Sequence, residues 1–354
     1  MNFINSSMGD INIDPPIDIK ETGASFLLGK WKGYQPHKGN TILLDNITEW
    51  INIHQFTNMD IKKENILIVP GASLGLSVCY SLVGSRDPGI AIPDFAFPLY
   101  KREIMYQGIN RYEYNISSCD WNKTLSDIEL SLKQGCKHIL WNVPHNPTGK
   151  IAPLYVTEQL CNLANQYNSF IISDEVYSSF HHTNKVVSPY AIDPTRTIVI
   201  SSFSKTFLMS GFRIGYIIAN KDLIDELASR IWNRHMSTSF IAQDIANLFI
   251  EKYPHFGELL NGLTITNLSI AMKLLDAKKV RYIRPDGGIF ILINVRDLGL
   301  DSVSFTKLFY KEKNVLVMSC SEFGDFGNDW IRINLCMNTE TLKQMLRRLL
   351  YYFN

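Results

Sequence analysis

The residues with the clearest chemical potential lie in one short segment, residues 201–215, which follows a run of apolar residues typical of a strand. Lys205 stands there among small and apolar neighbours, where desolvation would favour a neutral, nucleophilic amine. Ser202 lies three positions before this lysine and Arg213 lies eight positions after it. A segment that offers an amine, a hydroxyl and a guanidinium together is suited to a phosphorylated aldehyde.

The elements that must position this segment follow from the hydrophobic pattern. Short apolar runs rich in β-forming residues alternate with amphipathic stretches, and the runs occupy 66–69, 89–93, 138–143, 169–175, 197–202 and 213–219. This alternation predicts an α/β fold with a mainly parallel sheet that is covered by helices. Residues 124–134 and 154–167 read as helices that connect strands of this sheet.

The pattern changes after Asn220. Long helical segments are expected at 221–233 and 239–276, and a β-rich tail follows with strands near 288–294, 315–318 and 330–335 and a last helix at 339–352. This tail predicts a second, smaller α+β domain. The chain has no linker rich in proline, glycine or serine, so we expect the two domains to pack intimately.

The spacing S-x-S-K-x-x-x-x-x-G-x-R-x-G, matched in full from Ser202 to Gly215, resembles fold type I pyridoxal-phosphate (PLP) enzymes of aminotransferase class I/II. Further motifs of that family occur in order from Tyr34 to Arg332. The resemblance implies PLP as cofactor and a mixed, seven-stranded type of sheet in a large domain. It also implies three parts of the chain: an N-terminal lid or small-domain segment at 1–33, a large PLP-binding domain at 34–265 and a small domain at 266–354.

The resemblance assigns roles at the cofactor ring residue by residue. Lys205 would form the Schiff base with PLP and move the proton at the substrate Cα. Asp174, in the sequence SDEVY, would pair with the protonated ring nitrogen and keep the ring an electron sink. Tyr177 and Asn146 would hydrogen-bond the phenolic oxygen of the cofactor, and the expected catalytic residues are Lys205, Asp174 and Tyr177.

The resemblance also assigns the cofactor phosphate and one ring face. The phosphate would lie in a cup that combines a helix N-terminus, a hydroxyl and a guanidinium, made by Gly71, Ala72, Ser73, Ser202 and Arg213. Phe97 would stack on the ring. A register slip of two residues would give that position to Phe95 instead.

Two further residues bear on the substrate and on assembly. Arg332 would bind the substrate carboxylate as a bidentate fork beside Asn146. Tyr34 would reach the phosphate of a neighbouring subunit, which implies a homodimer with shared active sites; the alternative is an aromatic anchor at a helix start. The segment before Tyr34 offers no recognised N-x-x-x-G lead-in, so its substrate contacts are unassigned.

The expected activity is transfer of an amino group between an L-amino acid and a 2-oxo acid, in a ping-pong cycle through pyridoxamine phosphate. The same groups also serve elimination, replacement, cyclisation or oxidation of a specialised amino acid, as in enzymes that resemble the capreomycidine synthase type and act on an arginine-derived substrate. A non-catalytic PLP-binding module is the alternative from a different class of protein.

Composition excludes several other classes. Lys and Arg total 35 against 34 Asp and Glu, a net charge of +1 that argues against a nucleic-acid partner. No apolar run reaches the ~18 residues of a membrane helix, so we expect no membrane partner and a cytoplasmic location. The six cysteines are scattered without a C-x-x-C pair, which predicts free thiols and no metal site.

Overall fold

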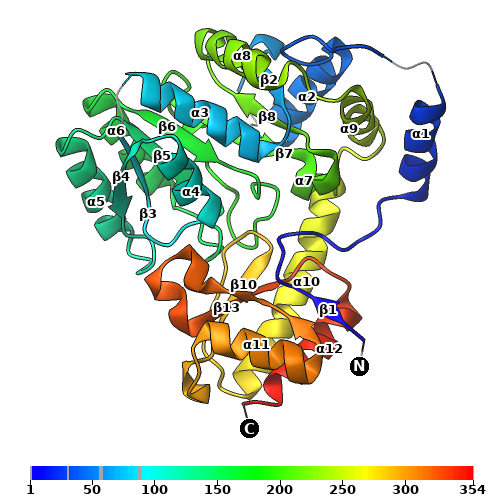
Figure 1. Cartoon of the computed structure of the whole chain (residues 1–354), viewed down its shortest axis with the longest axis vertical. Helices are drawn as coiled ribbons and strands as arrows, with labels where there is room; N and C mark the ends of the chain where they lie inside the picture. The colour runs from blue at the N-terminus through cyan, green and yellow to red at the C-terminus, as the bar shows by residue number, and fades with distance from the viewer. Residues whose placement is uncertain (1, 30–31, 56–58, 87–88, 354) are drawn as a thin grey trace.

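The computed structural model describes residues 2–29, 32–55, 59–86 and 89–353. A large sheet with helices on both faces occupies one end of the molecule, and a smaller sheet occupies the other. The long helix α10 (Phe256–Ala277) runs from the first part into the second (Figure 1). The chain thus builds two layered units that share one helix.

The large sheet has seven strands. Their order in space is β2 (Ile66–Val69), β8 (Gly215–Ile218), β7 (Thr197–Ser202), β6 (Phe170–Asp174), β5 (His138–Asn142), β3 (Gly89–Pro93) and β4 (Asn110–Tyr114). Strand β8 is antiparallel to both of its neighbours, and the remaining pairs are parallel. The predicted α/β fold with a mainly parallel, mixed sheet is therefore confirmed.

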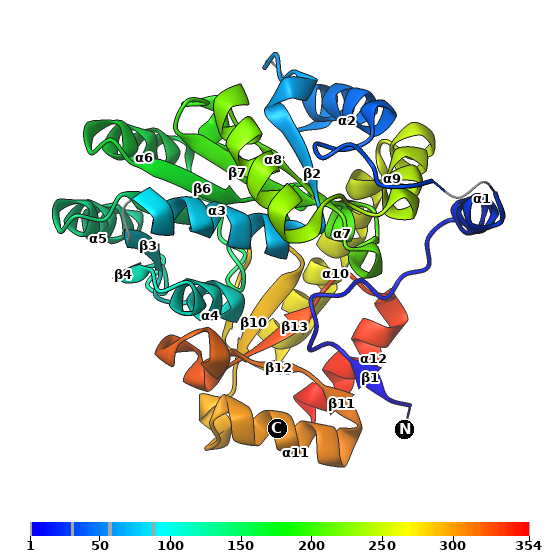
Figure 2. The same cartoon turned by 45° about the horizontal axis from the view of Figure 1, so that its top comes forward.

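Side-chain alternation explains why helices cover both faces of this sheet (Figure 2). Ile66 and Ile68 face the core under α2 (Thr41–His54) and α9 (Phe240–Lys252). Leu67 and Val69 face the core under the opposite helices, which are α3 (Ala72–Arg86), α4 (Pro98–Tyr106) and α8 (Lys221–His235). Farther along the first face lie α5 (Trp121–Lys133) and α6 (Leu154–Gln166).

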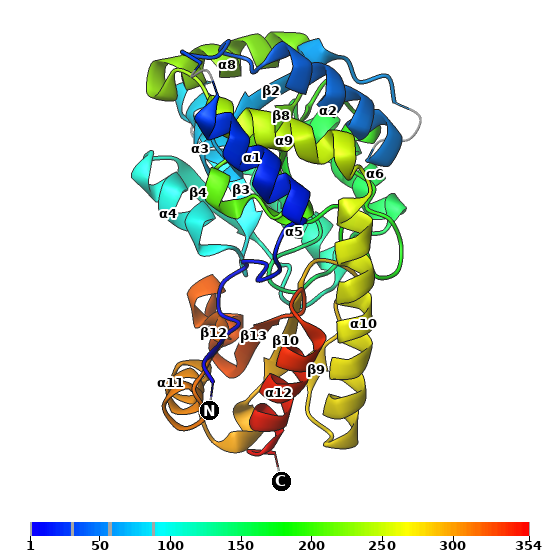
Figure 3. The same ribbon diagram turned by 90° about the vertical axis from the view of Figure 1, so that its right-hand side faces the viewer.

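The smaller unit contains both ends of the chain. Its antiparallel sheet has the order β12 (Met318–Ser319), β13 (Trp330–Asn334), β10 (Phe290–Asn294) and β9 (Tyr282–Ile283), and it packs with α11 (Ser302–Lys313) and α12 (Thr339–Leu350). Near the N-terminus, β1 (Ile4–Asn5) pairs with β11 (Val315–Leu316). Helix α1 (Ile17–Leu28) instead lies beside α9 of the large unit (Figure 3). The segment between β1 and α1 therefore crosses from one unit to the other.

The structure corrects several expected elements. The helix expected at 239–276 is two helices, since Pro254 interrupts it between α9 and α10. Helix α5 begins at Trp121, where the Asp120 side chain accepts from the Asn122 N–H at 3.0 Å. Strand β4 was not expected because its sequence, NRYEY, is mostly polar and lies at the sheet edge. Among the described residues, no helix combines the length and apolarity needed to cross a membrane.

Candidate active site

The predicted residues meet at the edge of the large sheet where its parallel strands end. Strands β5, β6 and β7 finish there at Asn142, Asp174 and Ser202, the usual place for ligand binding in such sheets. A cavity of about 630 Å³ opens at this edge, with the small unit on its far side. Of the residues predicted from sequence, all but Gly71 and Tyr34 line it: Ala72, Ser73, Phe97, Asn146, Asp174, Tyr177, Ser202, Lys205, Arg213 and Arg332.

Lys205 is held by a single helical turn that follows β7. The Ser202 hydroxyl accepts from the Ser204 N–H at 2.9 Å and starts α7 (Phe203–Thr206), which carries the lysine. Desolvation lowers the pKa of Lys205 to about 8; Arg332 and Arg213 add to this shift, while Asp10 opposes it. Near neutral pH a fraction of the lysine is therefore a neutral amine that can attack a carbonyl carbon.

Asp174 lies at the floor of the cavity. It is 4% exposed, and its Oδ2 accepts from the Tyr100 hydroxyl at 2.6 Å. Burial raises the pKa of Asp174 to about 6, although this hydrogen bond and one from the Val176 N–H favour the charged form. A cationic partner in the cavity would bring the pKa down, so the carboxylate suits a protonated ring nitrogen. Sequence reasoning missed Tyr100, which lines the cavity three residues after Phe97.

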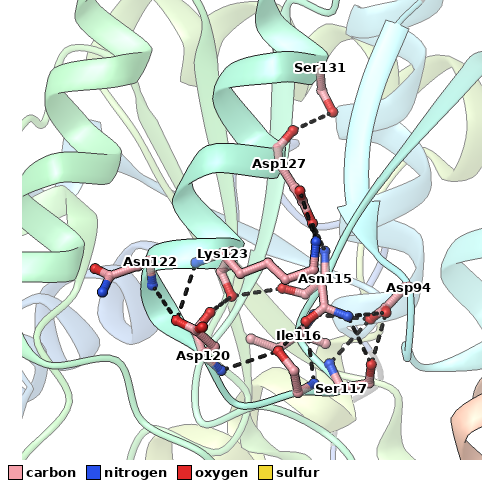
Figure 4. Close-up of polar contacts among 11 residues, drawn as sticks. Asp94, Asn115, Ile116, Ser117, Asp120, Asn122, Lys123, Asp127 and Ser131 are labelled. Atoms are coloured by element: carbon pink, nitrogen blue, oxygen red, sulfur yellow. Dashed lines mark hydrogen bonds and ion pairs between the residues drawn. The ribbon is translucent and has the colours of Figure 1, made fainter.

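The loop that carries Phe97 is fixed by a polar network around Asp94 (Figure 4). Oδ1 of Asp94 accepts from the Ile116 N–H at 3.0 Å. Oδ2 accepts from the Asn115 amide and the Ser117 hydroxyl, each at 2.9 Å. The end of β3 is thereby tied to the segment that follows β4, and the start of α4 is held in place at the cavity.

Of the two aromatic candidates in that loop, Phe97 lines the cavity. Phe95 is fully buried and packs against Phe323 and Phe326, with ring centroids 5.8 and 5.3 Å away. The alternative register therefore has no support in the geometry, and a flat ligand in the cavity would meet the ring of Phe97.

A cradle for an anion forms where β2 leads into α3. Gly71 has φ +84°, and a Cβ on it would lie 2.6 Å from Nη2 of Arg213. This glycine therefore allows the guanidinium to approach the backbone closely. Helix α3 begins at the next residue, Ala72, so its unpaired N–H groups face the same region. The arrangement can hold a phosphate between a helix N-terminus and Arg213, with the Ser202 hydroxyl beside it.

Arg332 projects from β13 of the small unit toward the cavity. It is 4% exposed, and its Nη1 donates to Oδ1 of Asn146 at 2.8 Å. Its Nη2 donates to the Ser7 carbonyl at 2.9 Å, and its guanidinium lies 3.8 Å from the centre of the Phe290 ring. Nε is buried without a hydrogen-bond partner among the described residues. A buried guanidinium with an unused donor is suited to a carboxylate.

The remaining predicted residues differ in their setting. Tyr177 is buried, lines the cavity and meets Phe290 edge-on, with 5.6 Å between ring centroids. Its hydroxyl and Nζ of Lys205 both lie next to Gly9, 3.2 and 3.7 Å from the position of a Cβ on that glycine. Burial raises the pKa of Tyr177, which therefore acts as a hydrogen-bond donor. Tyr34 is 77% exposed and lies outside the cavity of its own chain.

The N-terminal segment is the main part of the site that sequence reasoning missed. Residues 7–10 line the cavity, and the Gly9 carbonyl accepts from Nζ of Lys205. Asn334 holds this segment, since its side chain donates to the Asp10 carbonyl at 2.6 Å. The absence of a lead-in was a wrong expectation, because Asn5 to Gly9 has the N-x-x-x-G spacing. Asn334 also carried a signal, since it stands two positions from Arg332 on one strand face.

Gly9→Ala should lower kcat/KM by about 10-fold or more, because displacement of about 1 Å in an active site can cost as much as 10²-fold. The new Cβ would lie 3.1 Å from Phe290, 3.2 Å from the Tyr177 hydroxyl and 3.7 Å from Nζ of Lys205. Steady-state kinetics measures the effect. Gly262→Ala is the matched control, since this glycine is exposed on α10 and no side chain among the described residues lies within 4 Å of its Cβ position. Equal kcat/KM in the two variants would contradict this placement of the segment.

Comparisons with known proteins agree with this geometry. Residues 2–349 match the family model described as aminotransferase class I and II. The chain is 26% identical to an aspartate aminotransferase of Pyrococcus horikoshii and 25% identical to aromatic-amino-acid aminotransferase 2 of Thermococcus litoralis, in each case over 98% of this chain and 90% of the relative. A Thermus thermophilus aspartate aminotransferase structure superposes with a TM-score of 0.89 at 21% identity, covering 99% of this chain and 92% of that one. The chain belongs to the aminotransferase class I and II family.

Proposed function

We propose that this enzyme uses pyridoxal phosphate to transfer the amino group of an L-amino acid to a 2-oxo acid. The observation that carries the proposal is that one cavity brings together the amine of Lys205, the buried carboxylate of Asp174 and the guanidinium of Arg332. These are the three groups that an aldehyde cofactor with a basic ring nitrogen and an amino-acid carboxylate require.

The residues present fit this cofactor. A Cβ at Gly71 would fill the anion cradle, and Arg213 completes it with a positive charge. We assign the phosphate to that cradle together with the N–H groups of Ala72 and Ser73 and the hydroxyl of Ser202. Phe97 would then cover one face of the ring.

When bound, PLP supplies an aldehyde for an amine and a ring that withdraws electrons from Cα. Asp174 would keep a proton on the ring nitrogen, and Tyr100 keeps the carboxylate oriented by its hydrogen bond. Tyr177 and Asn146 would donate hydrogen bonds to the phenolic oxygen. Nζ of Lys205 would take the proton from the substrate Cα and deliver it to the carbon of the cofactor's aldehyde group, which is the proton movement that transamination requires.

The substrate is held by the small unit and by the N-terminal segment. Arg332 and Asn146 bind its α-carboxylate, which directs the Cα–H bond toward Lys205. The Ser7 carbonyl accepts from Arg332 and the Gly9 carbonyl accepts from Nζ of Lys205, so the segment at 7–10 covers these groups and would help to exclude water. Domain assignment follows this division: we assign 34–265 to the cofactor domain, 266–354 to the small domain and 1–33 to the lid and its attachments.

The exposed position of Tyr34 supports a homodimer in which this tyrosine reaches the phosphate of the partner's cofactor. Its side chain is 77% exposed in the single chain, and it precedes α2 in the sequence. A large aromatic side chain that is exposed in this way is available for contact with a second chain. Sedimentation should find a dimer, and Tyr34→Phe should release PLP faster than the native enzyme. A monomer with full activity would contradict this part of the proposal.

The activity is tested by absorbance spectra of the purified enzyme with a panel of amino acids that includes aspartate, phenylalanine and arginine. Conversion of the cofactor to its amino form, reversed by a 2-oxo acid, supports transamination. Release of ammonia or of a cyclic product without that conversion would show elimination or cyclisation instead. A protein that takes up no PLP would overturn the proposal.

Arg332→Ala should lower kcat/KM for amino acids by about 10²-fold, mainly through KM, because truncating one partner of a buried charge pair costs about 2–5 kcal/mol. Arg332→Lys should fall between the native enzyme and the alanine variant, since it keeps the charge and loses the fork. PLP titration provides the control, because the cofactor affinity should stay within a few-fold. An unchanged KM would refute the assignment of this residue.

A further inference from the structure

We propose that His54, His255 and Glu258 form a binding site for a divalent transition-metal cation, with zinc as the ion that best suits their donor atoms. Each residue offers one ligand atom, and these atoms all lie within 4.8 Å of one another. The three residues stand where α2 ends and α10 begins, and none of them lines the active-site cavity. The site is therefore separate from the proposed catalytic centre.

Two of the three ligand-atom separations are close to those of a tetrahedral site. Oε1 of Glu258 lies 3.1 Å from Nδ1 of His255 and 3.7 Å from Nδ1 of His54. With metal–ligand bonds of about 2.0–2.1 Å, ligand atoms around a tetrahedral zinc ion are roughly 3.3 Å apart. The two measured separations lie on either side of that value, so small side-chain rotations would complete the coordination. Magnesium and calcium prefer oxygen ligands, whereas zinc also binds imidazole nitrogen well. A set of two imidazoles and one carboxylate therefore favours zinc over magnesium or calcium.

One ligand is held in advance by the surrounding structure. The side chain of His54 is only 14% exposed, and its ring packs on Trp50 with 5.7 Å between ring centroids. The Trp50 indole N–H donates at 2.8 Å to the carbonyl of Pro254, the residue before His255. The tryptophan therefore fixes both sides of the site relative to each other. The conformational entropy that is lost when the metal binds comes mainly from the side chains of His255 and Glu258, which are 66% and 68% exposed.

The fourth coordination position can remain open to solvent. His54 and Glu258 line a cavity of about 370 Å³, which also contains His181 and Lys185. Lys185 is a like charge on this cavity wall, so it would weaken metal binding to some extent. A cation bound here would join the end of α2 to the start of α10, the helix that continues into the small unit. We therefore expect the bound metal to stabilise the fold.

The test uses untagged holoenzyme that has been treated with a chelator and then titrated with zinc in competition with a chromophoric chelator. We expect one zinc ion per chain at this site. His54→Ala, His255→Ala and Glu258→Gln should each weaken binding by at least about 10-fold, since even a residue that only supports a zinc ligand typically contributes 10–100-fold. Zinc should raise the melting temperature of the native enzyme and leave that of His255→Ala unchanged.

The matched control is His37, an exposed histidine that also contacts a tryptophan, Trp232, with 6.3 Å between ring centroids. His37→Ala should bind zinc as tightly as the native enzyme. Quenching of tryptophan fluorescence by Ni²⁺ gives a second readout, because it should be lost in Trp50→Phe and retained in Trp232→Phe. Equal zinc affinity in the native enzyme and in His255→Ala would overturn the proposal. Loss of zinc binding in His37→Ala would overturn it as well.

Discussion

Lys205→Met should lower kcat for transamination by about 10⁴-fold or more, the upper end of what a positioned acid–base group contributes, because it also removes the nucleophile. Methionine keeps much of the volume of the lysine side chain, so the fold should be preserved. Lys205→Ala should show the same loss. Steady-state kinetics with a responsive amino acid measures the effect, and the absorbance band that depends on lysine-bound cofactor should disappear in both variants.

Chemical rescue distinguishes a catalytic role from a structural one. Small primary amines should partly restore the activity of Lys205→Ala, since they can enter the space of the missing side chain and carry the proton. They should restore little in Lys205→Met, where the methionine fills that space. Lys133→Ala, at a lysine that is 56% exposed on α5, should remain fully active. Activity within 10-fold of native in Lys205→Met would contradict the assignment.

The same lysine predicts a pH dependence for cofactor uptake. Burial lowers the pKa of Lys205 to about 8, and only the neutral amine attacks an aldehyde. The rate at which the apoprotein takes up PLP should therefore rise with pH through about 8 and level off above it. Stopped-flow absorbance measures this rate. In Asp10→Asn the midpoint should move to lower pH, because the charge of Asp10 raises this pKa.

The local pattern of apolar and polar residues was sufficient to predict most strands of the large sheet. Its inner strands are short, apolar and buried on both faces, so their sequences stand out from the amphipathic helices between them. Strand β4 did not stand out, because one side of it faces solvent at the edge. The break at Pro254 was visible in sequence, yet the apolar periodicity continues across it and suggested one helix.

The active-site residues likewise fall into those that the sequence could predict and those that it could not. Lys205, Asp174 and Arg213 lie in motifs that resemble those of the family, which implies that they share one cavity, and the structure brings them together. Contacts between segments far apart in sequence carry no comparable signal. The Gly9 carbonyl meets Lys205 across 196 positions, and the partners His54 and Glu258 lie at the ends of different helices. Such pairs depend on how the layers pack, which periodicity does not describe.

Asp174→Asn should have opposite effects on activity and on the stability of the apoprotein. A neutral amide does not keep the ring nitrogen protonated, so kcat should fall by about 10²- to 10³-fold, the range typical of removing one electrostatic contact at the reacting centre. Tyr100→Phe should cost far less, since it removes a hydrogen bond and leaves the charge. Kinetics at saturating PLP separates this effect from weaker cofactor binding.

The stability effect follows from the direction of the pKa shift. Burial raises the pKa of Asp174 to about 6, above its usual value, so the folded apoprotein binds this proton more tightly than the unfolded chain does. The ionised group therefore destabilises the fold by an amount that develops as pH rises toward about 6 and is complete above it, on the order of 2–3 kcal/mol. At pH 7.5 apo Asp174→Asn should melt a few degrees above the native apoprotein, and the difference should vanish near pH 4.

Glu175→Gln is the matched control for this prediction. The neighbouring Glu175 is also buried, and burial raises its pKa to about 7, yet its carboxylate accepts from Ser173 and Ser188 and does not line the active-site cavity. Its neutralisation should stabilise the apoprotein above pH 7 and leave kcat nearly unchanged. Bound PLP should reduce or reverse the stability gain of Asp174→Asn, because the ring cation offsets the buried charge, and should not affect that of Glu175→Gln. If PLP acted equally on both variants, Asp174 would not be the partner of the ring nitrogen.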